Sequence, residues 1–151
     1  MTRVAIALGS NLGNREGYLR EAARRLAAII TGLELSTFYD TEAVGGAPQP
    51  RFLNGAAVGT CALSARELLD SLLAIEQDLG RTRPYPAAPR TVDLDLVLYD
   101  DAVIDEPGLT VPHPRFRERL FVLEPLAEMA PEWVDPITGK SVAQLLEALR
   151  A

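Results

Sequence analysis

The chain has 151 residues, enough for one domain with a buried core. Its 48% hydrophobic and 24% charged residues are ordinary for a soluble globular protein. The formal net charge of −6 argues against a protein that binds nucleic acid through a broad basic face.

The cysteine content and the apolar runs indicate a cellular compartment. Cys61 is the only cysteine, so no intrachain disulfide can form and one chain cannot build a cysteine-based zinc site. The apolar run at 4–8 is too short for a signal-peptide core, and no later run reaches transmembrane length. We therefore expect a cytoplasmic protein that does not bind membranes.

The spacing of apolar residues predicts a series of strands and helices along the chain. Two long segments between them, 40–51 and 81–90, are rich in proline or glycine and are predicted to be loops. We expect a strand over 4–8, a helix over 15–30 stopped by Gly32, strands over 33–39 and 52–61, a helix over 65–79 ended by Gly80, a strand over 92–99, a short helix between Pro125 and Pro131, and a last helix after Ser141.

Two helix starts carry a capping signature. Ser64 is followed three residues later by Glu67, and Ser141 by Gln144, as in a capping box. Up to residue 99 the predicted order is strand, helix, strand, strand, helix, strand. This order predicts an α+β fold with a ferredoxin-like antiparallel sheet and helices packed on it, followed by C-terminal additions, in a single domain over 1–151.

The segment with the clearest chemistry ends in Asp93 and Asp95. Side chains alternate along a strand, so both carboxylates share one face about 7 Å apart, while Leu94 and Leu96 enter the core. Oxygen ligands suit Mg²⁺, which often shares its shell with substrate phosphates. Three arginines, Arg81, Arg83 and Arg90, precede the pair, and arginine suits bidentate phosphate binding.

These charges leave two readings open. A surface hairpin with local salt bridges would also contain them, but arginines beside an acidic pair favour Mg²⁺ with a polyphosphate. The sequence has no G-x-x-x-x-G-K-[ST] phosphate loop and no dinucleotide fingerprint. Spacing alone therefore indicates Mg-dependent nucleotide or phosphate transfer with an unconventional nucleotide site.

Two further groups are candidates for ligand contacts. His113 is the only histidine, and the prolines on both sides of it fix the backbone that aims its ring. Phe52 and Asn54 alternate at the start of a strand and so offer a ring and an amide on one face. That pair suits a flat heterocycle, although a core phenylalanine beside a strand-end amide would look the same.

Together these segments resemble the 6-hydroxymethyl-7,8-dihydropterin pyrophosphokinase family. The most specific part is P-R-x-x-D-x-D at 89–95 with V-P-H at 111–113 downstream. The other matching segments lie at 7–13, 36–39, 52–54, 109–114 and 121–126, so the resemblance covers nearly the whole chain. It implies pyrophosphate transfer from ATP to hydroxymethyl-dihydropterin, giving AMP and the pterin diphosphate, in folate biosynthesis.

The resemblance also implies roles for individual residues. It implies two Mg²⁺ ions with ATP and the reduced pterin as the other small-molecule substrate. We also expect a monomer. The residues matched to catalysis are Arg81, Arg83, Arg90 and Asp95, with Asp93 and Asp95 as metal ligands. The residues matched to ATP binding are Glu76, Arg83, Arg90, Leu96, Thr110, His113 and Arg119. The residues matched to pterin binding are Thr41, Val44, Phe52, Asn54, Asp93 and Phe121.

Three other functions remain to be separated from this one. A different Mg-dependent nucleotidyl- or phosphotransferase would release pyrophosphate or ADP instead of AMP. A non-catalytic nucleotide sensor would still bind ATP after loss of Asp93. An RNA-binding ferredoxin-like module would need exposed aromatic side chains on its central strands and a basic face.

Overall fold

The structure, a computed structural model, describes residues 1–42, 50–80 and 91–151. Within these ranges five strands form one sheet, and each strand pair is antiparallel. The sheet order is β2-β4-β1-β5, and β3 also pairs with β4. The strands are β1 (Thr2–Ser10), β2 (Thr31–Leu35), β3 (Tyr39–Thr41), β4 (Phe52–Cys61) and β5 (Asp93–Tyr99).

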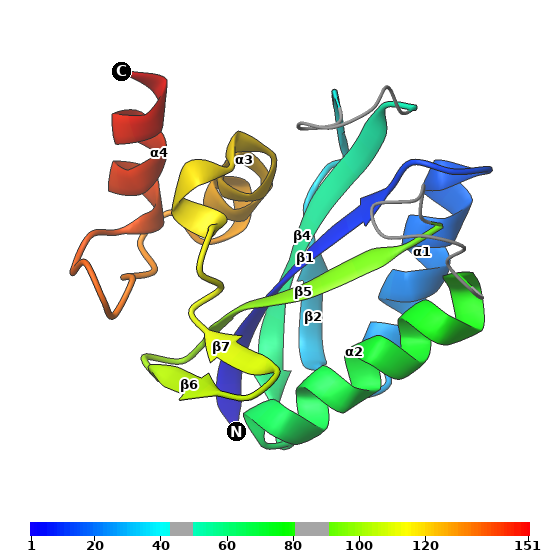
Figure 1. The fold of residues 1–151 in the computed structure, drawn as a ribbon, viewed down its shortest axis with the longest axis horizontal. Coiled ribbons are helices and arrows are strands. Elements are labelled where there is room, and N and C mark those ends of the chain that lie inside the picture. The colour runs from blue at the N-terminus through cyan, green and yellow to red at the C-terminus, as the bar shows by residue number, and fades with distance from the viewer. Residues whose placement is uncertain (43–49, 81–90) are drawn as a thin grey trace.

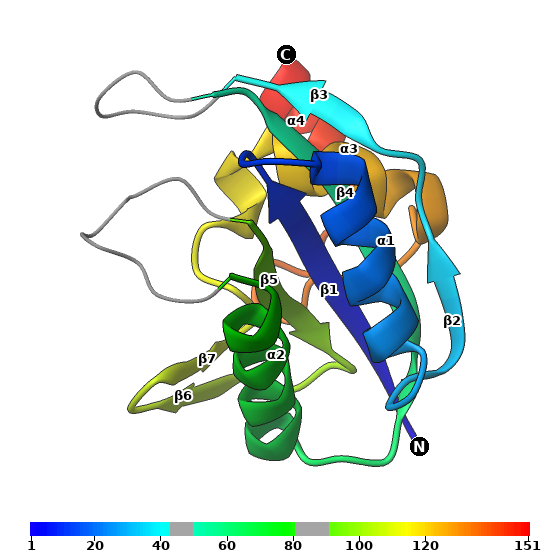
Figure 2. The same cartoon turned by 90° about the vertical axis from the view of Figure 1, so that its right-hand side faces the viewer.

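Helices cover both faces of this sheet (Figure 1, Figure 2). One face carries α1 (Arg15–Leu26) and α2 (Ala65–Gly80), and the other carries α3 (Leu120–Met129) and α4 (Val142–Arg150). A hairpin of β6 (Ile104–Glu106) and β7 (Leu109–Val111) and a 3-10 turn over Phe116–Glu118 lie between β5 and α3 in the chain. Among the described residues, no helix is long and apolar enough to cross a membrane.

The alternation of β1 builds two cores from one strand. Val4, Ile6 and Leu8 are buried in the core under α1 and α2. Ala5 and Ala7 face the second core, where their small side chains leave room for α3 close to the sheet. Both faces of the central strands are therefore covered by helices.

The predicted capping boxes are confirmed at both helices. The Ser64 N–H donates to Glu67 Oε1 at 2.9 Å, and the Glu67 N–H donates to Ser64 Oγ at 3.1 Å. Ser141 and Gln144 exchange the same two bonds at 2.8 and 3.2 Å. Each box satisfies backbone donors that the first helical turn leaves without a partner.

The prediction for the end of the first helix was wrong. The helix ends at Leu26, and the Ala27 N–H still bonds the Ala23 carbonyl. The apolar periodicity continued to Ile30 because Ile30 is buried just before β2, not because it is helical. Gly32 lies inside β2 with φ of 64°, where the pairing with β4 is irregular, so it is not a helix stop.

Three other predictions of secondary structure also differ from the structure. The strand expected over 33–39 is two strands, β2 and β3, separated by 36–38. The β6–β7 hairpin was not predicted; its turn contains Gly108 with φ of 75°. The helix expected after Pro125 begins at Leu120 and contains that proline, whose ring is buried in the second core.

Candidate functional site

Three strands meet at Gly9 on the face of the sheet that α3 covers. Gly9 pairs with Asn54 of β4 on one side and with Asp93 of β5 on the other. Ala7, two residues earlier, pairs with Ala56 and with Asp95 in the same way. The register therefore places an amide and two carboxylates along one short stretch of the sheet.

Gly9 lets two neighbouring side chains pack closely against the backbone of β1. A Cβ atom at Gly9 would lie 3.0 Å from Asn54 Oδ1 and 3.5 Å from Phe52 Cδ1. The space above Gly9 is therefore occupied by Asn54 and Phe52, and a side chain at position 9 would displace Asn54.

The predicted pterin contacts at Thr41, Phe52 and Asn54 come together on β3 and β4. Thr41 pairs with Phe52, and the Asn54 amide donates to Thr41 Oγ1 at 2.5 Å. Asn54 is buried, so its amide group is held in one orientation and is shielded from bulk solvent. These residues form a fixed polar and aromatic wall beside Gly9.

Phe121 stands in the first turn of α3, on the same side of the sheet. It is partly buried against the core under α3, and the Arg119 guanidinium lies 5.4 Å from the centre of its ring. That separation allows a cation–π interaction. Arg119 and Phe121, predicted for ATP and pterin respectively, are thus neighbours.

Asp93 and Asp95 occupy β5 as predicted, on the face opposite Leu94 and Leu96. Between them, the Leu94 N–H donates to Glu76 Oε2 at 2.7 Å. Glu76 comes from α2, so this bond fixes the backbone of the acidic strand to a helix. The predicted ATP contact Glu76 is therefore also a support for the two aspartates.

Asp93 and Asp95 fit one kind of metal site. Within the described residues, no group of three or more His, Cys, Asp or Glu side chains is arranged to hold a metal ion. Two carboxylates without a third protein ligand suit Mg²⁺, which completes its shell with waters and substrate phosphates. They do not suit a structural zinc ion, which takes four protein ligands.

His113 follows β7 and is held by its backbone and its ring. Its N–H donates to the Val97 carbonyl at 3.0 Å, and its Nδ1 accepts from the Arg115 N–H at 3.2 Å. Burial lowers the pKa of His113; the Asp95 charge opposes that shift, and Arg119 and Arg115 add to it. A neutral ring that accepts at Nδ1 carries its proton on Nε2 and can donate from there.

The remaining predicted contacts divide into three groups. Thr110 is exposed on β7 and open to a ligand. The Leu96 side chain is only 5% exposed and packs in the core under α1 and α2, so an ATP contact at Leu96 would be made by its backbone. Four predicted residues lie outside the described ranges: Val44, Arg81, Arg83 and Arg90.

Glu128 is a residue of this region that the sequence did not reveal. Its carboxylate accepts from the Thr37 N–H at 2.9 Å, the Thr37 hydroxyl at 2.7 Å and the Tyr39 hydroxyl at 2.8 Å. The Thr37 bonds, backbone first, lower the pKa of Glu128, while the bond to Glu128 raises the pKa of Tyr39. Glu128 thereby ties α3 to the chain that leads into β3.

Residues 5–131 match the family described as 7,8-dihydro-6-hydroxymethylpterin-pyrophosphokinase (HPPK). This chain belongs to the HPPK family. A relative from Synechocystis, named 2-amino-4-hydroxy-6-hydroxymethyldihydropteridine pyrophosphokinase, is 46% identical over 145 residues, 94% of this chain and 73% of the relative. A Bacillus subtilis relative of the same name is 48% identical over 126 residues, 82% of this chain and 75% of the relative.

Solved structures of the HPPK family share the fold. Wild-type Plasmodium falciparum HPPK-DHPS with pteroate superposes with a TM-score of 0.76 at 12% identity, over 97% of this chain. This chain spans 42% of that longer protein. At such low identity the likeness establishes the shared architecture: an antiparallel sheet with helices packed on it.

Proposed function

We propose that this HPPK-family protein transfers the pyrophosphoryl group of ATP to the hydroxymethyl group of 6-hydroxymethyl-7,8-dihydropterin, as a step of folate biosynthesis. One observation carries the proposal. Gly9 pairs with Asn54 on one side and with Asp93 on the other, so an amide and a carboxylate flank the same point of β1 in a chain of this family. The amide side suits a flat heterocycle, and the carboxylate side suits a metal-bound polyphosphate.

The reaction balances with two products. The hydroxymethyl oxygen forms a bond to the β-phosphorus of ATP and loses its proton. The bond between that phosphorus and the oxygen bridging to the α-phosphate breaks, and AMP leaves. The bond forms and breaks in line, so the task of the protein is to place the two substrates and to stabilise charge.

We assign the binding of the pterin and the binding of ATP to separate sets of residues. Thr41, Asn54, Phe52 and Phe121 hold and orient the pterin, with Val44 as a further contact. Thr110, His113, Glu76 and Arg119 bind the nucleotide, and the neutral His113 ring donates from Nε2. Arg81, Arg83 and Arg90 bind the phosphates. Asp95 can at most relay the hydroxyl proton.

Asp93 and Asp95 would hold Mg²⁺, two ions with each ATP. Bound Mg²⁺ supplies neutralisation of phosphate charge. The support for this assignment is the donor set, since two carboxylates on one face leave most of the metal shell to phosphates and water.

We further propose one ferredoxin-like domain over 1–151 that acts as a cytoplasmic monomer. The sheet order β2-β4-β1-β5 supports this topology. An RNA-binding module would present aromatic side chains on its central strands; β1 has none, and β4 has only Phe52 at its first position. The partners are therefore ATP and the reduced pterin.

The proposed activity can be tested with purified protein, Mg-ATP and hydroxymethyl-dihydropterin. We expect a pterin diphosphate by mass spectrometry, and Asp95→Asn should lower turnover at least about 10²-fold, the scale of losing one preorganised electrostatic element. Absence of pterin diphosphate with the wild-type protein would reject the activity. Near-normal turnover of Asp95→Asn at saturating Mg²⁺ would reject the metal role alone.

A further inference from the structure

The strand that carries Thr41 has little support of its own. In the described part of the chain, β3 spans only Tyr39–Thr41 and pairs with β4 alone. Its three positions oppose Asn54, Leu53 and Phe52. A three-residue edge strand gains few ladder bonds, so side chains must hold its position relative to β4 and the rest of the site.

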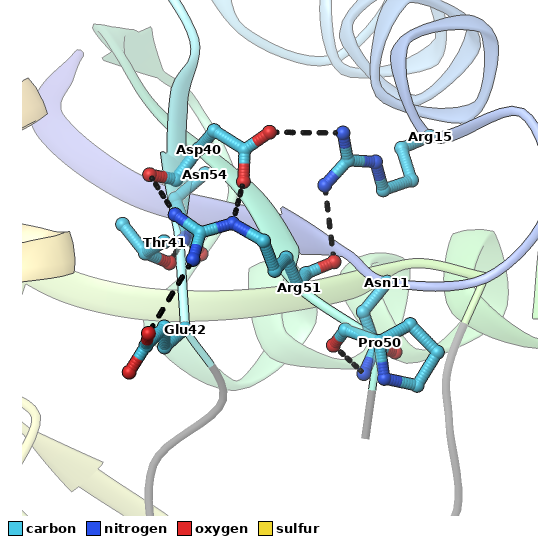
Figure 3. Close-up of polar contacts among 8 residues, drawn as sticks. All are labelled: Asn11, Arg15, Asp40, Thr41, Glu42, Pro50, Arg51 and Asn54. Carbon is cyan, nitrogen blue, oxygen red and sulfur yellow. Dashed lines mark hydrogen bonds and ion pairs between the residues drawn. The ribbon is translucent and has the colours of Figure 1, made fainter. Parts of the chain in front are cut away.

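Asp40, the middle residue of β3, binds two arginines from different elements (Figure 3). Its Oδ1 accepts from Arg51 Nε at 2.7 Å, and its Oδ2 accepts from Arg15 Nη2 at 3.1 Å. Arg15 is the first residue of α1, and Arg51 immediately precedes β4. One carboxylate therefore joins α1, β3 and the start of β4.

The same region is tied a second time through backbone carbonyls. Arg15 Nη1 donates to the Arg51 carbonyl at 3.0 Å, and Asn11 Nδ2 donates to the Pro50 carbonyl at 3.2 Å. Both carbonyls belong to the two residues before Phe52. The turn between β1 and α1 thus holds the entrance to β4 while Asp40 holds β3 beside it (Figure 3).

Asp40 lies on the wrong side of β3 to touch the pterin. Thr41 bonds Asn54 on the face that α3 covers, and alternation directs Asp40 to the other face, toward α1. Any effect of Asp40 on the pterin must therefore pass through the backbone of Thr41 and Phe52. This distinguishes a positioning residue from one that contacts the substrate.

A contribution to the free energy of unfolding does not explain why Asp40 binds two arginines. The side chains of Asp40, Arg15 and Arg51 are 47%, 30% and 53% exposed. Ion pairs this exposed contribute little to the free energy of unfolding. They can still fix geometry, because two arginines reach the same carboxylate from different directions.

We propose that Asp40, together with Arg15 and Arg51, is a positioning cluster that sets Thr41 and Phe52 for the pterin. The proposal rests on the function proposed above and adds to it a determinant of pterin affinity. Hydrogen bonds from Arg15 and then Arg51 lower the pKa of Asp40, so the cluster is ionised at neutral pH. The nucleotide side, on β5 and β7, has no residue in the cluster.

The test replaces Asp40 by asparagine and compares it with a matched control. Glu21 on α1 likewise binds two arginines, Arg24 and Arg25, through an exposed carboxylate, but both belong to its own helix. We expect Asp40→Asn to lower kcat/KM for the pterin about tenfold, as for a small misplacement of a substrate, and to change KM for ATP less than twofold. Glu21→Gln should leave both unchanged.

Two variants of Arg51 test whether the ion pair itself matters. Arg51→Gln removes the positive charge beside Asp40, whereas Arg51→Lys keeps it. Arg51→Gln should weaken pterin binding more than Arg51→Lys, as measured by equilibrium titration with a non-hydrolysable ATP analogue present. Equal losses in the two variants would contradict the ion-pair argument.

Three results would overturn the proposal. These are an unchanged kcat/KM for the pterin in Asp40→Asn, equal losses for pterin and ATP, or an equal effect in Glu21→Gln. If Asp40→Asn lowers Tm markedly, Arg15→Gln serves instead, and it must show the same pterin-specific loss. Failure of the proposed function would look different, because the wild-type protein would then show no turnover of the pterin.

Discussion

The carboxylate of Glu76 accepts a hydrogen bond of 2.7 Å from the backbone N–H of Leu94. Leu94 stands between Asp93 and Asp95 on β5, which lies at the edge of the sheet with β1 as its neighbour. A donor there would otherwise need water or another partner. Glu76 thereby fixes the strand segment that we assign to metal binding.

Replacing Glu76 separates this support from any direct contact with ATP. Glu76→Ala removes the acceptor, so we expect turnover to fall about tenfold and the Mg²⁺ concentration for half-maximal rate to rise. Glu76→Gln keeps an oxygen that can accept from Leu94, so its turnover should fall less. Steady-state rates over a Mg²⁺ titration measure both, and equal losses in the two variants would show that the charge of Glu76 matters more than the bond.

The close approach of Asn54 to Gly9 predicts a steric effect on pterin binding. A Cβ atom there meets Asn54 Oδ1 at 3.0 Å, so Gly9→Ala should weaken pterin binding about tenfold and Gly9→Val more. ATP affinity should change less than twofold, as measured by calorimetry. Tight pterin binding by Gly9→Val would show that the position of Asn54 over Gly9 is not needed to bind the pterin.

The ring of Phe121 predicts a loss that depends on aromatic character. Phe121→Ala should weaken the pterin more than ATP, since an aromatic stack adds about 0.5–1.5 kcal/mol beyond burial. Phe121→Leu keeps the apolar bulk on α3 and should retain part of the affinity. If calorimetry finds equal losses for both ligands in Phe121→Ala, the damage is structural.

Asp135 predicts how stability depends on pH. Burial alone would raise the pKa of Asp135, but hydrogen bonds from Arg117, Thr138 and the Ile137 backbone outweigh it and hold the pKa at about 2. The folded pKa is below the ordinary aspartate pKa of 3.8, so this stabilisation is present above about pH 4 and is lost as the pH falls toward 2.

Asp135→Asn should therefore lower the free energy of unfolding more at neutral pH than in acid. The Asp135 side chain is fully buried against Arg117, so we expect a loss of about 3 kcal/mol in the free energy of unfolding near pH 7. The difference from the wild type should shrink near pH 3. Urea unfolding at both pH values measures it, and a constant difference would contradict the role of the ionised carboxylate.

Local pattern predicted most of the fold. Strands β1, β4 and β5 and helices α2 and α4 were found from periodicity and capping residues, because their neighbours in sequence determine them. The short strand β3 was missed as a separate element, since Asp40 and Glu128 hold its surroundings through residues distant in sequence. The end of α1 was misplaced because Ile30 is buried for a tertiary reason.

The candidate site was predictable in its residue types but not in its layout. Alternation placed Asp93 and Asp95 on one face, as the structure has them. The position of Gly9 between Asn54 and Asp93 depends on the register of three strands, which no local pattern specifies. The bond from Leu94 to Glu76 likewise needed the packing of α2 against β5.

The most direct test of the central claim is the fate of the phosphates of ATP. The protein is incubated with Mg-ATP labelled separately at the β- and γ-phosphates and with hydroxymethyl-dihydropterin, and the products are separated. We predict that both labels appear together in the pterin product and that AMP forms in equal amount. Stoichiometric ADP with only the γ-label on the pterin, or pyrophosphate released with AMP joined to the acceptor, would contradict pyrophosphoryl transfer.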